Sequence, residues 1–229
     1  MAKVEMNRVY YFCNEEFGLE NLEKSRIKLS TVLEMNDPFE LSCYKLSDKM
    51  HRRAAKKLKE DFANRFGFIC FSGSFNSPVQ WAHYADSHRG ICLGFDVPRS
   101  ELRPVNYIDS RMGFDLNAYL NMDSNGKRDW LAELMRTKNS HWGYEDESRR
   151  MFFIEGSDSE VIKGRTLYFR RFADIGVLKE VVVGCNSGIS RERVKKALAG
   201  LSGLVESFKV RPAFNSFVMV RNQNKGLWK

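Results

Sequence analysis

The sequence contains no paired cysteines and no long apolar run. Its five cysteines are an odd number without a Cys-x-x-Cys pair, which argues against a disulfide framework and a zinc ribbon and favours reduced thiols. No segment approaches the ~18 consecutive apolar residues of a membrane-spanning helix, and the first residues lack the apolar region of a secretory signal peptide. We therefore expect a cytoplasmic protein that has no membrane partner.

The commonest catalytic motifs are missing as well. The sequence has no Gly-x-x-x-x-Gly-Lys-Ser/Thr loop, Gly-x-Gly-x-x-Gly turn, His-Glu-x-x-His helix or Gly-x-Ser-x-Gly elbow, so the usual nucleotide, zinc and hydrolase signatures are absent. The histidines, at positions 51, 83, 88 and 141, are scattered, and a histidine more often caps, packs or bonds a backbone group than binds a metal. We expect no metal centre.

The chain does have enough apolar material for one core, together with an excess of positive charge. Its 229 residues are 43% hydrophobic and contain no repeats or proline-rich linkers, which predicts a single domain over 1–229. Lysine and arginine outnumber aspartate and glutamate by 37 to 29, giving a formal charge of +8. Because positive charge favours association with polyanions, the excess indicates either a merely solvated basic face or a surface for a nucleic-acid partner.

Hydrophobic periodicity predicts an α+β fold. Strands outnumber helices and do not alternate cleanly with them, which favours a mixed or antiparallel sheet over a doubly wound one. In the helix at 48–66, Ala54, Leu58 and Phe62 recur every four residues, and lysines fill the neighbouring positions. The predicted strands are 9–12, 26–31, 66–72, 90–96, 106–108, 144–154, 166–172, 178–183 and 216–221, and the predicted helices are 18–24, 48–66, 79–86, 130–138 and 191–201.

Two polar clusters come early in the chain. Residues 36–40, which include Asn36 and Asp37, read either as a tight turn or as a loop that lines a cleft. Residues 80–88 place Trp81, Tyr84 and Ala85 at helical spacing, which predicts a packing face. His83 then flanks that face, and it is expected either to cap or orient the helix or to contact a ligand.

A third polar cluster, residues 142–149, leads into an apolar run. If this segment is extended, Glu145, Glu147 and Arg149 point to one face of a strand. Burying such charges costs free energy, so we expect them either to be exposed to solvent or to form part of a site. The segment is therefore either an edge strand with solvated charges or a site. In a site, one carboxylate would hold a hydroxyl or stabilise a developing cation, and Arg149 would orient it.

Taken in order, the motifs resemble a bacterial family, the uncharacterised domain of AbiGi-type abortive-infection proteins. The resemblance covers about residues 8–200 and rests on Asn-Asp-Pro-Phe-Glu at 36–40, Trp-Ala-His-Tyr-Ala at 81–85 and Trp-Gly-Tyr-Glu-Asp-Glu-Ser-Arg at 142–149. Ser148 departs from the family, which usually has an aromatic residue at this position. The resemblance implies a toxin or phage-defence effector, with a cognate antitoxin or immunity partner.

The order of elements also resembles the ADP-ribosyltransferase superfold, in which the central sheet is split into two packed halves with flanking helices. This resemblance is an analogy of fold. It implies that NAD is bound by Tyr10 or Tyr11 on a first strand and by Ser72 at the end of a second, with Glu147 catalytic and Glu145 and Arg149 beside it. The other residues expected to bind NAD come from the first two polar clusters: Asn36, Asp37, His83 and Tyr84.

The chemistry of NAD cleavage independently suits these residue types. Cleaving the nicotinamide–ribose bond creates oxocarbenium character at the ribose, which a nearby carboxylate can stabilise. Two alternatives stay open. In a metal-dependent nuclease, Asp37, Glu145 and Glu147 would bind Mg²⁺. In a non-catalytic module, the basic segment 50–66 would bind nucleic acid.

Overall fold

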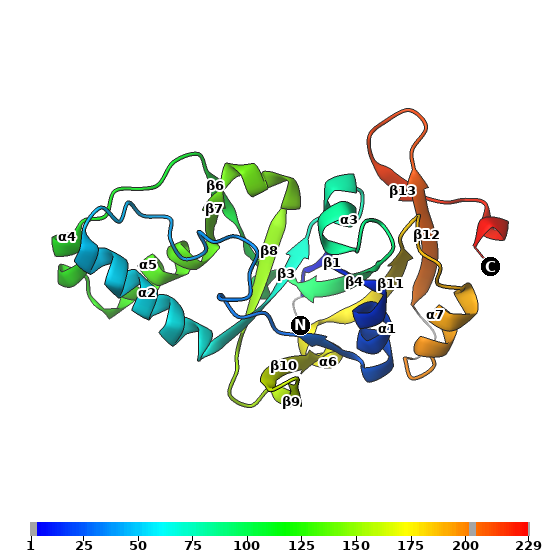
Figure 1. Cartoon of the computed structure of the whole chain (residues 1–229), viewed down its shortest axis with the longest axis horizontal. Coiled ribbons are helices and arrows are strands. Elements are labelled where there is room, and N and C mark those ends of the chain that lie inside the picture. Colours follow the sequence, from blue (N-terminus) through cyan, green and yellow to red (C-terminus); the bar gives the residue numbers. More distant parts are fainter. Residues whose placement is uncertain (1–3, 202–204, 229) are drawn as a thin grey trace.

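An eight-stranded mixed sheet forms the centre of the computed structural model, which describes residues 4–201 and 205–228. Neighbouring strands are antiparallel, except β11 and β12, which are parallel. The sheet confirms the expected α+β class with a mixed sheet (Figure 1). From one edge to the other the strands are β13 (Met219–Arg221), β12 (Glu206–Pro212), β11 (Val177–Val183), β4 (Ile91–Pro98), β1 (Met6–Cys13), β3 (Phe66–Ser72), β8 (Glu147–Phe153) and β5 (Arg103–Pro104).

The sheet has little backbone pairing in its middle, between β1 and β3. Strand β1 pairs with β4 along its whole length, from Met6 to Cys13. With β3 it pairs at a single position, where Tyr10 lies opposite Ser72. Strand β3 pairs in turn with β8 along its whole length. We call the single-pair junction between β1 and β3 the seam, and the candidate site lies beside it.

Two smaller sheets contain the other strands. In one, β2 (Arg26–Lys28) pairs with β10 (Arg165–Arg171), which pairs with β9 (Asp158–Ile162). The β9–β10 hairpin turns at Lys163 and Gly164, both with positive φ, as a two-residue type I′ turn requires. In the other, β6 (Asn106–Ile108) and β7 (Thr137–Asn139) pair in parallel. This second pair matters for the site because β7 carries Lys138.

Most helices begin at a residue whose side chain accepts a backbone N–H, as N-caps do. These caps are Asn14, Asp48, Ser77, Asp115, Asp123 and Ser190. Helices α2, α4 and α5 gather at one end of the molecule, and α7 lies at the other (Figure 1). The helices are α1 (Glu15–Lys24), α2 (Lys49–Ala63), α3 (Pro78–Tyr84), α4 (Leu116–Asn121), α5 (Ser124–Arg136), α6 (Phe172–Ile175) and α7 (Arg191–Ala197), with 3₁₀ turns at η1 (Arg99–Glu101), η2 (Ser140–Glu145) and η3 (Lys225–Leu227).

Three groups of buried apolar side chains hold these elements together. One face of the sheet packs on α1, α6 and α7, and the other packs on α3, whose Trp81 is fully buried. The Trp81 indole N–H donates to the Phe75 carbonyl at 2.6 Å. The third group joins β3 to α2 and α5. Trp81 and Ala85 are therefore core residues, as expected, whereas Tyr84 is only half-buried and belongs to the site.

Several sequence expectations need correction. The strand predicted at 144–154 begins only at Glu147, because residues 140–145 form η2. In α2, Leu58 and Phe62 join the core but Ala54 is exposed. The sequence also does not predict β5, β7, β9, β12, α4 or α6. Within the described residues no helix is long and apolar enough to cross a bilayer, and the five cysteines are free thiols.

Candidate active site

Tyr10, Ser72 and Glu147 form a row across three neighbouring strands. Tyr10 lies opposite Ser72 at the seam, and Ser72 lies opposite Glu147 on β8. Residues directly opposite one another in a ladder project to the same face of a sheet. Three residues that are far apart in the sequence therefore come together on one face.

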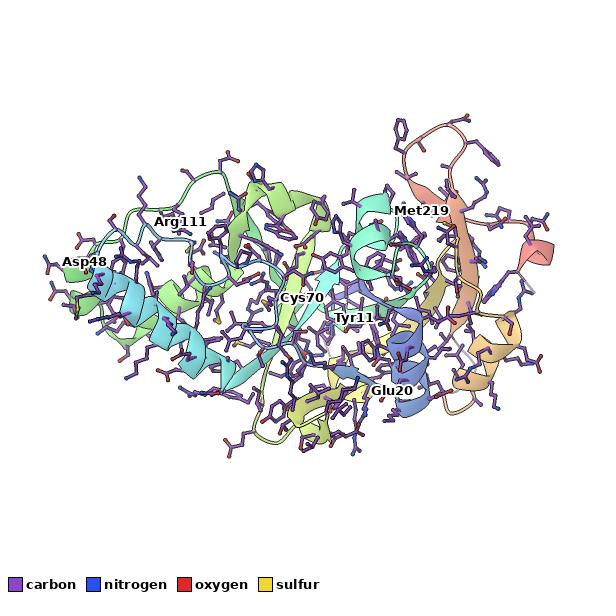
Figure 2. The ribbon with its side chains drawn as sticks, in the orientation of Figure 1. Tyr11, Glu20, Asp48, Cys70, Arg111 and Met219 are labelled. Carbon is purple, nitrogen blue, oxygen red and sulfur yellow. The ribbon has the colours of Figure 1, made fainter. Side chains whose placement is uncertain are left out.

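A cavity of about 230 Å³ opens beside this row. It lies near the middle of the molecule, where Figure 2 labels two of its residues, Tyr11 and Cys70. Residues 34–36 and Glu40 also border it, as do Gln80 of α3 and Lys138 of β7. Seven of the ten candidate residues line this cavity: Tyr10, Tyr11, Asn36, Ser72, Tyr84, Glu145 and Glu147.

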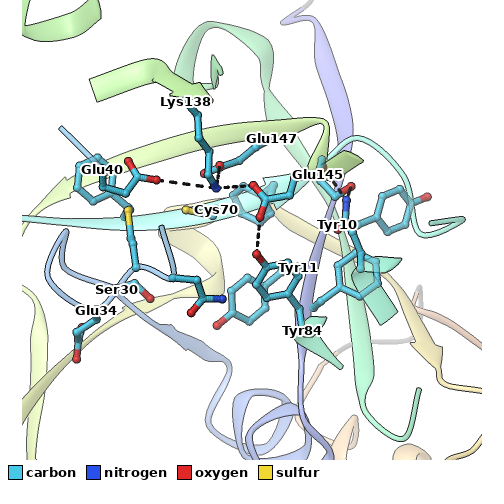
Figure 3. A pocket seen from close by; sticks show the side chains of 17 residues that line it. Tyr10, Tyr11, Ser30, Glu34, Glu40, Cys70, Tyr84, Lys138, Glu145 and Glu147 are labelled. Carbon is cyan, nitrogen blue, oxygen red and sulfur yellow. Dashed lines mark hydrogen bonds and ion pairs between the residues drawn. The ribbon is translucent and has the colours of Figure 1, made fainter. Parts of the chain in front are cut away.

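Lys138 is surrounded by three carboxylates at the back of the cavity (Figure 3). Its Nζ lies 2.5 Å from Glu145 Oε2, 3.2 Å from Glu147 Oε2 and 3.9 Å from Glu40 Oε1. All four side chains are buried. An ammonium group thus occupies the position between the carboxylates that a metal ion would need.

Arg149 supplies the second cation of this cluster. Its guanidinium binds both oxygens of Glu40, at 2.6 and 2.9 Å, and Glu147 at 2.6 and 3.2 Å. It also donates to the Met135 carbonyl at 2.7 Å. Strand β8 lies between β3 and β5, and Arg149 is only 3% exposed. The interpretation of residues 142–149 as an edge strand with solvated charges is therefore wrong.

The two catalytic candidates differ in their protonation. Burial alone would raise the pKa of Glu147, but Arg149 and then Lys138 outweigh it and lower that pKa to about 2. Burial raises the pKa of Glu145, and Lys138 only partly opposes it. Glu145 also accepts a hydrogen bond from the Tyr84 hydroxyl. Glu147 is thus firmly ionised, whereas Glu145 takes up a proton more readily.

Local backbone geometry brings both glutamates to Lys138. Asp146, between them, has a φ of 45°, in the left-handed region, so the chain turns sharply as η2 passes into β8. The end of β3 approaches this turn so closely that a Cβ at Gly73 would lie 2.0 Å from Asp146 Oδ2. Glu145 therefore reaches the cluster from η2 rather than along an extended strand.

Gln80 joins α3 to both sides of the seam. Its side-chain amide donates to Ser72 Oγ at 2.8 Å and to the Glu145 carbonyl at 2.7 Å. The Ser72 hydroxyl itself donates to the Ser74 carbonyl at 3.0 Å. In this arrangement Ser72 supports Gln80, and its hydrogen-bonding capacity is already used within the protein.

Three candidate residues do not line the cavity. Arg149 lies behind Glu147, as an orienting residue would. Asp37 borders a different cavity, and its Oδ1 accepts the Phe39 N–H at 2.8 Å. His83 is exposed and stacks on Tyr144. The Mg²⁺ triad of Asp37 with Glu145 and Glu147 is not assembled, and the described residues contain no group of three or more His, Cys, Asp or Glu that could hold a metal.

Two members of the charged cluster, Glu40 and Lys138, were not predicted as site residues. Glu40 belongs to the motif at 36–40, which was interpreted as a turn or cleft loop without a role for this carboxylate. The sequence predicts a helix over 130–138 that ends at Lys138, whereas α5 ends at Arg136 and the chain continues into β7. What marks Glu40 as a member of the cluster is its burial and its pairing with Arg149. Both features become visible only once the fold is known.

Comparison with known proteins gives a partial family match. Residues 80–150 match the family described as "Protein of unknown function (DUF2971)". Neither a curated protein nor a solved structure matches the chain. The segment similar to that family includes Lys138, Glu145, Glu147 and Arg149, whereas Tyr10, Glu40 and Ser72 lie outside it.

Proposed function

We propose that the chain is an ADP-ribosyltransferase that takes ADP-ribose from NAD at the seam cavity. The observation that carries this proposal is the row of Tyr10, Ser72 and Glu147 beside the cavity. These are the three positions that the resemblance to the superfold assigns to NAD and to catalysis. The resemblance to abortive-infection domains supports a role as a toxin or phage-defence effector.

Glu147 is suited to stabilise positive charge at the ribose. In the transfer, the bond between the nicotinamide nitrogen and C1′ breaks, and its electron pair leaves with nicotinamide. The positive charge that develops on the ribose faces a carboxylate that Arg149 keeps ionised. Preorganised charge of this kind is worth more in a buried site than in water, because no solvent must reorganise.

Glu145 is suited to accept the proton that the acceptor loses when it bonds to C1′. Burial brings its pKa closer to neutrality, which favours a general base. The cluster of three carboxylates and two cations also leaves excess negative charge beside the cavity. That excess favours a cationic pyridinium and the cationic transition state.

The size of the cavity determines how much of NAD it encloses. About 230 Å³ is less than the ~300 Å³ at which sites for whole drug-sized ligands begin. It therefore accommodates the nicotinamide and its ribose, with the adenylate outside. Tyr11 and Tyr84 offer aromatic rings and Asn36 a polar contact, while Ser72 acts as a positioning residue through Gln80.

Label transfer tests the proposal. We would incubate the protein with NAD labelled in its adenylate part and with RNA, DNA or cell lysate, in EDTA. Glu147→Gln should lower transfer by roughly 10²–10³-fold, as removal of one electrostatic contact does. Glu34→Gln, an exposed carboxylate at the rim of the same cavity, should leave it within about two-fold.

Three results would count against the transferase. They are the absence of NAD binding by the wild type, full transfer by Glu147→Gln, and cleavage of nucleic acid that needs a metal but not NAD. The last of these would favour the nuclease instead. Loss of transfer in Glu145→Gln with full transfer in Glu147→Gln would exchange the roles of the two glutamates.

A further inference from the structure

A second cavity, of about 450 Å³, adjoins the first. Lys138 lines both, so its side chain forms part of the wall between them. The volume lies within the ~300–1,000 Å³ range of small-molecule sites. Its wall also includes Asp37, Asp109, Arg111, His141 and Trp142.

Asp37 is the unusual member of this wall. It is 3% exposed, and within the described residues its Oδ2 has no hydrogen-bond partner. An unsatisfied buried acceptor is costly, and a ligand that brings a donor removes that cost. Because Oδ1 accepts the Phe39 N–H, Oδ2 is the oxygen of this carboxylate that is left for a ligand.

The rest of the wall matches a nucleotide. Trp142 is half-buried, and Lys138 Nζ lies 4.6 Å from the centroid of its ring. A base would stack on the ring face that Lys138 does not cover. Arg111 and His141 are exposed at the wall and can contact phosphate. Helix α2 reaches the same place, because Lys59 Nζ donates to the carbonyl of Pro38, another wall residue, at 3.1 Å.

We propose that this second cavity binds one base of a single-stranded nucleic acid, with Asp37 accepting its N–H groups. Guanine is the best match, because N1–H and the N2 amino group are adjacent donors that one carboxylate can accept together. Uracil offers a single N–H that lies between two carbonyl groups. The oxygens of these carbonyl groups and a carboxylate repel each other. The cavity therefore distinguishes bases by their Watson–Crick edges.

A role for the second cavity in catalysis rests on the proposed transferase function. The strand held by Asp37 is then the acceptor, and Lys138 separates it from Glu145 and Glu147 by one side chain. One of its nucleophilic atoms would bond to C1′ as nicotinamide departs and would pass its proton to Glu145. Base binding itself does not require NAD.

Calorimetric titration of the full chain with GMP and UMP, without NAD, tests the site. We expect GMP to bind at least ten-fold more tightly than UMP. Asp37→Asn should weaken GMP at least ten-fold, because the amide cannot accept both N–H groups. The matched control is Asp109→Asn, an exposed carboxylate on the same wall, which should change GMP binding less than three-fold.

A second variant avoids dependence on a buried residue. Arg111 is exposed. Arg111→Gln should remove most of the preference for GMP over guanosine, which lacks the phosphate. Equal binding of GMP and UMP, or unchanged GMP binding in Asp37→Asn, would overturn the proposal. GMP binding without any transfer from NAD would leave the base site standing and reject the transferase.

Discussion

Arg149 binds both carboxylate oxygens of Glu40, at 2.6 and 2.9 Å, across 109 residues of sequence. This contact joins two of the three polar clusters that the sequence displays separately. Arg149 also binds Glu147. The position of Glu147 beside the cavity therefore depends in part on a residue that does not line that cavity.

Arg149→Met should therefore destabilise the protein strongly. Removing one partner of a buried ion pair typically costs about 3–5 kcal/mol, because the remaining charges are left uncompensated. Here two carboxylates, Glu40 and Glu147, lose the nearer of their two cationic partners and keep only Lys138, at 3.9 and 3.2 Å. Urea unfolding measures the cost. Arg99→Met, which breaks an exposed pair with Glu5, should cost no more than about 0.5 kcal/mol, and an equal loss in both variants would contradict the buried cluster.

Glu147 should make stability depend on acid pH. Its pKa in the folded protein is about 2, below an ordinary value of 4.5. A carboxyl group with a lowered pKa contributes stability that is present above its unfolded pKa and is lost as pH falls through its folded pKa. The difference in unfolding free energy between wild type and Glu147→Gln should therefore shrink as pH falls from about 4.5 towards 2.

Unfolding in urea at several pH values in this window provides the measurement. The exposed Glu16→Gln controls for the loss of one surface charge. A difference between wild type and Glu147→Gln that stays constant with pH would mean that Arg149 does not hold the carboxylate ionised.

Lys138→Met should move the acid limb of the activity profile to higher pH. In the proposed transfer Glu145 must be ionised to accept a proton, and Lys138 opposes the rise that burial causes in its pKa. Without the ammonium, that pKa rises further and activity at low pH falls first. Rates of ADP-ribose transfer over a pH series would show the shift. The exposed Lys56→Met should leave the profile in place.

The lysines of α2 should fall into two classes. Lys56 and Lys57 are exposed. If they contact phosphates, replacing both by glutamine should lower the log–log salt slope of single-stranded RNA binding by roughly 0.7–0.9 per contact. Lys59 is different, because its Nζ is used by the Pro38 carbonyl. Lys59→Gln should lower the melting temperature. Superimposable salt titrations for the wild type and both variants would remove α2 from any nucleic-acid surface.

The sequence predicts many of the elements of this fold because local patterns determine them. The apolar run at 66–72 and the short segment at 106–108 are strands with those bounds. The β9–β10 hairpin is not predicted, because Lys163-Gly164 is not one of the dipeptides that typically mark a two-residue turn. Its first strand was missed because charged residues interrupt the apolar pattern.

The candidate site was only half accessible from the sequence. Glu145, Glu147 and Arg149 are neighbours in the chain, so spacing alone brings them to attention. Lys138 and Glu40 join them through β7 and the 36–40 turn, and nothing local marks either residue as buried. Likewise, Asp37 and Glu40 lie in one motif but face different cavities, a divergence that spacing does not predict.

The seam has a mechanical consequence. A sheet joined in its middle by one residue pair can bend there without breaking a long ladder of hydrogen bonds, whereas β1–β4 and β3–β8 are each paired along their whole length. Cooperative opening units tend to follow such boundaries. Amide protons of β4 and β11 would then exchange in one group and those of β3 and β8 in another. The two rates would reveal a hinge that passes directly beside Glu147.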